Sequence, residues 1–482
     1  MHHRVSKMES VLLNKNIPVV SSADVVVTGG GLGGVAAAIA AARAGASVVL
    51  LETNGFLGGV ATAGMCCSVC NCLFTRSREL KVHGIPLEIA DKLATEAGGP
   101  GMSWRKHKGH IIYDVEKAKL VLAQLVKSEG VELRFNSPVA DVIVEEGRVQ
   151  AVITSGKNGL EAIKCKVLVD STGDCDSAIL AGSEYTCYGR PRASYVFRLG
   201  NVDVDKFINY FRQNPEQFPG NMDLEWTVDE AIRQYDENGT FLFPHGGGMQ
   251  FSLIANAIEK GDLSKEWKRY DTLNAMQMHL IKKTGVCHII TGYVENDNLD
   301  AANLSVNITE GMEIAQMFAE CFRKNIPGFE NAFVNNQADD LGVRVSRCIK
   351  GLKAFKNEMR KMPYRCEDAV GIGVMMEEKV LHGGKGAWSA QVFGDDVYEI
   401  PMSCLIPENL QNVIIGAGRG ADTEPPGTLR VMVDTMSVGQ GAGTVAAVAA
   451  KNKTTIAEVN YQAVRSELEK RGVVFPSEKT QQ

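Results

Sequence analysis

Three glycines near the start of the chain are spaced for binding phosphate groups. Gly29, Gly31 and Gly34 form a G-x-G-x-x-G sequence, and the carboxylate of Glu52 follows further along the chain. The first glycine allows a tight turn, the second lets the backbone approach a pyrophosphate, and the third lets a helix pack closely on a strand. A carboxylate at Glu52 can accept hydrogen bonds from both ribose hydroxyls and would repel a 2′-phosphate. The pattern therefore predicts a dinucleotide other than NADP.

The segments around these residues have the composition that such a site needs. Residues 24–28 are an apolar, β-branched run typical of a buried strand, and residues 35–43 are an alanine-rich helical segment that ends near Gly45. Residues 47–51 form a second apolar strand, which ends on Glu52. Free N–H groups at the start of the helix, together with the positive end of its dipole, would hold the phosphates.

The overall composition excludes several classes of protein. The chain has 482 residues, of which 45% are hydrophobic and 22% charged, and its net charge is −6 without a long basic run. Nucleic acid is therefore not an expected partner. No apolar segment reaches the roughly 20 residues of a membrane span. Twelve cysteines without a recognisable export signal indicate a reducing compartment, so we expect a cytoplasmic protein.

The order of segments indicates a nucleotide-binding domain interrupted by a long insertion. An antiparallel meander is expected over residues 139–164, and helical patterns occur at 308–324 and near 339–356. An apolar strand at 412–415 restores the alternation of strands and helices. The predicted divisions are an N-terminal tail (1–21), the first part of the nucleotide-binding domain (22–192), an inserted α+β substrate-binding or cap domain (193–400), the second part of the nucleotide-binding domain (401–452) and a C-terminal helical tail (453–482).

Three more motifs accompany the glycine fingerprint. They are FLGGVAT at 56–62, VDSTGD at 169–174, and a block at 412–443 that contains GAGR, LRVM and GQGAG. Together the four motifs resemble those of the FAD-dependent oxidoreductase family with the glutathione-reductase-like flavin fold, over residues 24–450. The resemblance implies an α/β fold: a Rossmann-like FAD-binding domain with a parallel sheet and a small β-meander, interrupted by the inserted domain.

The resemblance also implies FAD as the cofactor. The diglycine would let the flavin half of FAD come close to the backbone. N–H dipoles from the loop and the helix start near 428–432 would face the flavin's pyrimidine ring. No second G-x-G-x-x-G follows a strand, so a built-in NAD(P)H domain is not expected. The expected FAD-binding residues are Gly29, Gly31, Leu32, Gly33, Gly34, Glu52, Thr53, Gly58, Gly59, Thr62, Val139, Thr172, Gly173, Asp174, Gly418, Arg419, Thr428, Leu429, Arg430 and Met432.

Four cysteines, Cys66, Cys67, Cys70 and Cys72, follow the diglycine within a short stretch. Cys67 and Cys72 have the C-x4-C spacing of the redox-active dithiol in disulfide reductases that share this fold. We favour the alternative that the four are small buried thiols beneath the flavin. A zinc site built on Cys67 and Cys70 would need a second C-x-x-C pair, which the chain lacks, so no metal is expected.

Arginine and histidine residues are the other candidates for the chemistry. Residues 342–347 resemble the family's GxRxSR segment, with Val345 where glutamate is more frequent. Arg344 and Arg347 would orient a substrate carboxylate or the reduced flavin, or serve as structural ion-pair residues. A histidine could take a hydroxyl proton during hydride transfer, and His83 is nearest in sequence to the flavin-facing segment. The other histidines considered are His107, His110, His245, His288 and His382.

These residues predict an FAD-dependent oxidoreductase that exchanges a hydride with a small organic substrate. Oxidation of an alcohol or amine and reduction of an activated double bond are both open. One alternative is a flavin-linked thiol–disulfide oxidoreductase that uses Cys67 and Cys72, and another is a non-catalytic or electron-transfer flavoprotein. The expected partner is a small-molecule substrate, and a separate electron donor or acceptor and an oligomer are left open.

Overall fold

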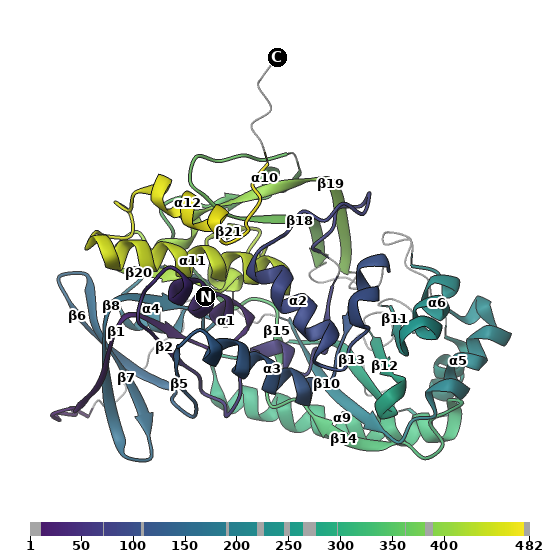
Figure 1. Ribbon diagram of the computed structural model, residues 1–482. Coiled ribbons are helices and arrows are strands. Elements are labelled where there is room, and N and C mark those ends of the chain that lie inside the picture. Colours follow the sequence, from purple (N-terminus) through teal and green to yellow (C-terminus); the bar gives the residue numbers. More distant parts are fainter. Residues whose placement is uncertain are drawn as a thin grey trace.

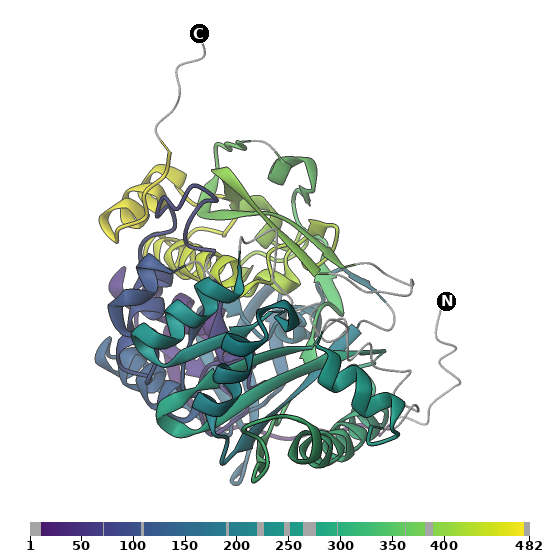
Figure 2. The same ribbon diagram turned by 90° about the vertical axis from the view of Figure 1, so that its right-hand side faces the viewer.

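Two large sheets, each with its own helices, make up most of the molecule (Figure 1). In this computed structural model the described residues are 11–70, 72–107, 110–188, 192–218, 226–244, 251–263, 276–295, 297–361, 363–380 and 389–476. Turning the molecule brings the teal elements of the second sheet to the front (Figure 2). None of the helices in these ranges is long and apolar enough to cross a membrane.

The first sheet is built from parallel strands around β1 (Val19–Thr28). β1 lies between β2 (Val48–Leu51) and β8 (Gly159–Asp170), and β5 (Glu132–Arg134) extends the sheet beyond β2. Each of the four residues of β2 is buried, as expected for a strand covered on both faces. The predicted α/β fold with a parallel sheet is confirmed.

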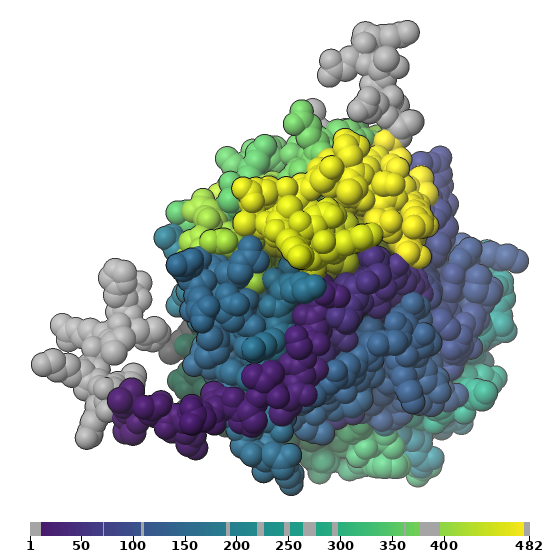
Figure 3. Space-filling view, turned by 60° about the vertical axis from the view of Figure 1, so that its left-hand side comes forward, coloured from purple at the N-terminus to yellow at the C-terminus, as the bar shows by residue number. Residues whose placement is uncertain are grey.

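The long strand β8 explains how the meander joins this sheet. Its first half pairs antiparallel with β7 (Arg148–Gly156), which pairs with β6 (Val139–Glu145). Its last residues pair in parallel with β20 (Val413–Ile415), the strand that follows the insertion. Ile17 packs on the meander, and Figure 3 shows this N-terminal part of the chain (purple) lying on the surface beside blue segments.

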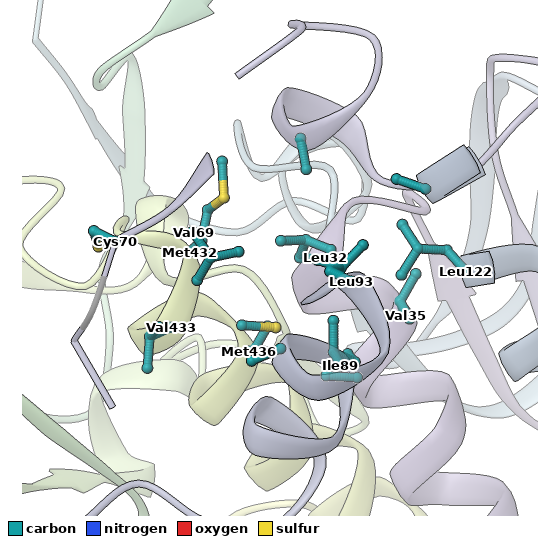
Figure 4. Close-up of a cluster of buried hydrophobic side chains, with 14 of the residues drawn as sticks. Leu32, Val35, Val69, Cys70, Ile89, Leu93, Leu122, Met432, Val433 and Met436 are labelled. Atoms are coloured by element: carbon teal, nitrogen blue, oxygen red, sulfur yellow. The ribbon is translucent and has the colours of Figure 1, made fainter. Parts of the chain in front are cut away.

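Two small-residue helices pack unusually close together beside the sheet. They are α1 (Leu32–Arg43) and α11 (Met432–Asn452). A Cβ atom on Gly443 would lie 2.1 Å from the carbonyl oxygen of Ala37, so only glycine permits this approach. Figure 4 shows Leu32 of α1 and Met432 of α11 in one apolar cluster with residues of α2 (Ile85–Thr95) and α3 (Val115–Ser128).

The second sheet has the strand order β11-β12-β13-β10-β14, and a short β15 also pairs with β10. Aromatic side chains pack on it, and the ring centroids of Phe211 and of Phe241 on the sheet are 6.0 Å apart. The strands are β10 (Arg192–Gly200), β11 (Thr240–Phe243), β12 (Gln277–Ile281), β13 (Val286–Glu295), β14 (Phe333–Gln337) and β15 (Gly342–Val343). The helices of this part are α5 (Val204–Gln213), α6 (Val228–Asn238), α7 (Ser252–Glu259) and α9 (Ala301–Asn325).

A hairpin that precedes β20 in the chain lies on α11 rather than on the second sheet. It consists of β18 (Ala369–Val380) and β19 (Ser389–Pro401). A Cβ atom on Gly441 of α11 would lie 2.6 Å from the carbonyl oxygen of Val370, and Tyr398 donates a hydrogen bond of 3.1 Å to Asp434 of α11. The hairpin thus helps to fix α11, whose first residues face the site described below.

The remaining elements are short. The helical pattern at 308–324 is confirmed by α9, whereas the one near 339–356 is wrong, because residues 347–349 pair with another strand instead. The short strands are β3 (Ser68–Val69), β4 (Ile111–Ile112), β9 (Tyr185–Cys187), β16 (Arg347–Ile349), β17 (Phe355–Lys356) and β21 (Thr423–Glu424). The short helices are α4 (Asp176–Leu180) and α10 (Glu358–Lys361), and α12 (Tyr461–Lys470) follows α11.

Candidate functional site

A cavity of about 580 Å³ lies where the carboxyl ends of β1, β2 and β8 face the second sheet. This is the edge at which ligands bind in sheets of this kind. The predicted cofactor residues that line it are Gly29, Gly31, Leu32, Gly33, Glu52, Thr53, Gly58, Gly59, Val139, Thr172, Gly173, Arg419, Arg430 and Met432. Gly34, Thr62, Asp174, Gly418, Thr428 and Leu429 are not among its lining residues.

The fingerprint glycines have different geometric roles. Gly29 has a φ of +89°, and a Cβ atom there would lie 2.6 Å from the carbonyl oxygen of Ser171. A Cβ atom on Gly34 would lie 1.9 Å from the carbonyl oxygen of Gly29, so Gly34 closes the turn without facing the cavity. Around Gly31, in contrast, the nearest protein atom to such a Cβ is 4.0 Å away. Gly31 therefore leaves its space open for a ligand.

Glu52 joins the end of β2 to the fingerprint turn. Its carboxylate accepts a hydrogen bond of 2.6 Å from the N–H of Gly30 and one of 2.8 Å from the N–H of Asn54. Burial raises the pKa of Glu52, and these two N–H groups partly offset that effect. Because each carboxylate oxygen has two acceptor positions, both oxygens can also accept from a ribose in the cavity.

The diglycine loop is held in place by Thr62, which was predicted to bind the cofactor. Gly58 and Gly59 both have positive φ values, and the hydroxyl of Thr62 donates to the carbonyl oxygen of Leu57 at 2.7 Å. A Cβ atom on Gly58 would lie 2.5 Å from the Thr62 hydroxyl oxygen. Thr62 thus supports the loop from behind, while Gly58 and Gly59 line the cavity.

The turn after β8 is fixed by two aspartates with different partners. The buried Asp170 accepts hydrogen bonds from the N–H of Thr172 at 3.0 Å and of Ala178 at 2.8 Å. Asp174 is ion-paired with Arg419 at 2.9 Å and also accepts a hydrogen bond from Ser346. Asp174 therefore holds Arg419 at the cavity wall, and its predicted contact with FAD stays a prediction.

The start of α11 lies at the wall of the cavity. Helix α11 begins at Met432 without a capping side chain on Val431, and both residues line the cavity. Leu429 lies behind this edge, because a Cβ atom on Gly418 would meet its carbonyl oxygen at 1.9 Å. The hydroxyl of Thr428 donates to the carbonyl oxygen of Pro425 at 2.5 Å. Leu429 and Thr428 thus shape the loop that precedes the helix.

The two predicted cations lie in different places. Arg344 lines the cavity and donates a hydrogen bond of 3.1 Å to the hydroxyl of Ser194 on β10. Arg347 is ion-paired with Asp176 and lies against the ring of Tyr185. Arg344 therefore lies where it could contact a substrate or the flavin. Arg347 instead forms a structural ion pair.

In the cysteine-rich segment after the diglycine, every second residue from Cys66 to Cys70 lines the cavity. Cys66, Ser68 and Cys70 line it, as the two-residue period of a strand requires, and Cys67 does not. Burial, with the neighbouring Cys66 and Cys287, raises the pKa of Cys67 well above its ordinary value, which makes it a poor nucleophile. The sulfur of Cys72 lies 2.8 Å from that of Cys70. Within the described ranges, no group of three potential metal ligands comes together.

A serine and two histidines, which the sequence did not single out as a unit, form a polar group at the cavity wall. The Ser68 hydroxyl oxygen lies 2.9 Å from Nε2 of His279 and 3.3 Å from Nδ1 of His110. Ser68 and His110 line the cavity, and His279 is fully buried behind them on β12. His83 is not a lining residue. The earlier candidates His245 and His382 lie outside the described residues.

The shape and chemistry of this cavity fit FAD. Glycines leave room for a pyrophosphate at the start of α1, where the first-turn N–H groups have no acceptor within the helix. Glu52 is placed for a ribose, and the uncapped start of α11 supplies N–H groups for a second polar ring system. Bound there, FAD supplies the chemistry of hydride transfer.

Comparison with known protein families also supports FAD as the cofactor. The family model for FAD dependent oxidoreductases matches residues 24–468. Digeranylgeranylglycerophospholipid reductase 2 of Methanothermobacter thermautotrophicus is 31% identical over 189 residues, and the match spans 38% of this chain and about half (48%) of that relative. A geranylgeranyl bacteriochlorophyll reductase-like protein of Thermoplasma acidophilum is similar in structure, with a TM-score of 0.47 and 15% identity over 93% of this chain and 83% of that one. The flavin-dependent brominase Bmp2 gives a TM-score of 0.42 and 13% identity over 93% and 83% of the two chains. The chain belongs to the FAD-dependent oxidoreductase family, and FAD is its cofactor.

Proposed function

We propose that this enzyme transfers a hydride between FAD and a small organic substrate bound against the second sheet. The observation that supports this most directly is the continuity of the cavity. It extends from the fingerprint glycines to Val196, Leu242 and Ile290 of the second sheet, so one space can hold both the cofactor and an apolar substrate. Arg344, at the same wall, would pair with a carboxylate or another anionic group of that substrate.

The Ser68–His110–His279 group supplies the proton chemistry that such a transfer needs. When an alcohol or amine is oxidised, a hydride leaves its carbon and a proton leaves its oxygen or nitrogen. His110 takes that proton at a ring nitrogen, and the Ser68 hydroxyl holds the ring through its 3.3 Å contact with Nδ1. In the reverse direction, when an activated double bond is reduced, the same ring gives a proton to the second carbon.

The source of electrons is part of the proposal. The sequence holds one dinucleotide fingerprint. The flavin would therefore receive electrons from the substrate or a separate donor, or pass them to a separate acceptor. The curated relative bears the name of a reductase, which supports testing the reductive direction together with the oxidative one. None of the twelve cysteines is joined to another by a disulfide in the structure, which supports a reducing compartment, and for that we propose the cytoplasm.

The test is a change in the flavin spectrum under anaerobic conditions. The FAD-loaded protein is mixed with alcohols and amines of increasing apolar size, and the photoreduced protein with α,β-unsaturated carbonyl compounds. Bleaching in the first series or return of the oxidised spectrum in the second supports the proposal. If FAD stays bound and no compound of either series changes its spectrum, the protein is an electron-transfer or structural flavoprotein instead.

A matched pair of histidine variants assigns the proton step. His110→Gln removes an imidazole ring that lines the cavity, whereas His83→Gln removes a histidine that does not line it. We expect the first variant to slow flavin reduction and the second to retain the rate. Loss of rate in His83→Gln with retention in His110→Gln would reverse this assignment.

A further inference from the structure

The sulfur atoms of Cys70 and Cys72 lie 2.8 Å apart. A disulfide requires about 2.05 Å between sulfurs, so a small rotation of the two side chains would bring them to bonding distance. Both residues are buried: Cys70 is 7% exposed and Cys72 0%.

Cys70 brings this pair to the cofactor. It lies one strand period beyond Ser68, on the side of the chain that lines the cavity. Figure 4 shows Cys70 in the same apolar cluster as Val69 and Met432, the latter being the first residue of α11 and also a lining residue. Cys70 therefore faces the space that FAD occupies.

Cys72 is fully buried and does not line the cavity. Burial and the charge of Asp434 raise the pKa of Tyr398 well above its ordinary value, and Cys72 adds to that effect. Tyr398 and Asp434 are joined by the 3.1 Å hydrogen bond between β19 and α11. The pair of sulfurs thus extends from the cavity wall into the buried interior.

From this placement we infer that Cys70 and Cys72 form a reversible disulfide that exchanges two electrons with the FAD in the cavity. When the sulfur–sulfur bond forms, the two S–H bonds break. Two electrons and one proton pass to the oxidised flavin, and the second proton passes to a base, the imidazole of His110, which lines the same cavity. In the reverse step the reduced flavin returns the electrons and the disulfide opens to two thiols.

This inference rests on FAD as the cofactor and not on the organic substrate proposed above. It gives the protein a second group that takes up two electrons, in addition to the flavin. A separate dithiol compound could reduce this disulfide, and a separate disulfide compound could oxidise the two thiols. Bleaching of the flavin by an alcohol or amine would leave the inference untouched. Its failure would likewise leave the substrate proposal standing.

The experiment counts electrons and locates the sulfur bond. Air-oxidised holoenzyme, freed of external thiols, is titrated anaerobically with dithionite while the flavin spectrum is followed. We expect the wild type to take up two electrons per flavin beyond the two that the flavin itself takes. In parallel, alkylation under denaturing conditions before and after the titration is followed by peptide mass analysis. The peptide with Cys70 and Cys72 should be closed before and alkylated at both sulfurs afterwards.

Single replacements complete the test. Cys70→Ser and Cys72→Ala should each lose the extra two electrons, whereas Cys66→Ser, a cavity-lining cysteine of the same segment, should retain them. The wild-type mass analysis does not depend on whether these variants fold. The inference is overturned when Cys70 and Cys72 are both alkylated in air-oxidised protein, or when the Cys70→Ser protein still takes up the extra electrons.

Discussion

A Cβ atom on Gly34 would lie 1.9 Å from the carbonyl oxygen of Gly29. The two glycines thus touch through their backbones, and the turn between β1 and α1 closes on itself. Gly31, between them in sequence, has no protein atom closer than 4.0 Å to the place of a Cβ. One motif therefore contains positions that serve the fold and one that serves the ligand.

Alanine replacements should separate these two roles. Gly34→Ala forces the backbone of the turn apart, and we expect it to lower the free energy of unfolding of the FAD-free protein by about 1–3 kcal/mol or more. Gly31→Ala adds a methyl group in open space, so the FAD-free protein should unfold as the wild type does, while FAD binding weakens. Denaturant unfolding and fluorescence titration with FAD measure the two effects. Equal FAD affinity in Gly31→Ala and wild type would contradict the phosphate site.

Glu52→Gln should weaken FAD binding roughly tenfold to a hundredfold. The N–H groups of Gly30 and Asn54 hold the carboxylate in place, and a charge-assisted hydrogen bond from a ribose hydroxyl to this carboxylate would contribute about 1.5–3 kcal/mol. An amide offers one acceptor oxygen and would turn an N–H toward a donor. Glu132→Gln, on the neighbouring strand β5 but away from the cavity lining, is the matched control. Titration of the apoprotein with FAD compares the three proteins, and equal affinities would remove Glu52 from the site.

His110→Gln should slow reduction of the flavin by a good substrate by roughly 10²- to 10⁴-fold, the range of a positioned acid–base group. The loss should shrink at high pH, because hydroxide in the solvent then takes over proton removal. Ser68→Ala keeps the ring but removes its 3.3 Å contact, so a smaller loss with a retained pH profile is expected. Stopped-flow absorbance over a pH series gives both quantities. A pH-independent loss in His110→Gln would mean that the ring only shapes the cavity.

The parts of the site that were predicted from the sequence are those whose function lies in the backbone. Gly29, Gly31 and the diglycine have local sequence signals, because tight turns and close approaches exclude side chains. Residues that act through side chains are harder to place. Thr62 and Asp174 carry family motifs, yet in the structure Thr62 holds a loop from behind and Asp174 fixes Arg419.

The Ser68–His110–His279 group shows why the rest was not predictable. His279 is far along the chain from Ser68, and a strand pairing between β12 and β13 decides which way its ring points. No spacing in the sequence encodes that contact. A local signal did exist for Cys70, because the period of two that places Ser68 at the cavity also places Cys70 there. The C-x4-C spacing instead indicated Cys67, which does not line the cavity.

His288 on β13 should make the stability of the protein depend on pH. Burial, with the charge of Arg198 on the neighbouring strand, lowers the pKa of His288 from its ordinary value of 6.5 to about 3. The folded protein thus keeps the ring neutral, while the unfolded chain binds a proton as the pH falls below 6.5. The contribution is fully present above that pH and is lost as the pH falls toward 3.

Between pH 7 and pH 5 this one residue should cost about 2 kcal/mol of the free energy of unfolding. In His288→Leu, which leaves a side chain that does not titrate, the fall in stability over the same interval should be smaller by that amount. Urea unfolding of the two FAD-free proteins at pH 7, 6 and 5 measures the difference. Other groups titrate equally in both proteins, so the comparison isolates His288. Parallel stability curves for wild type and variant would show that the ring is protonated in the folded protein or reached by water.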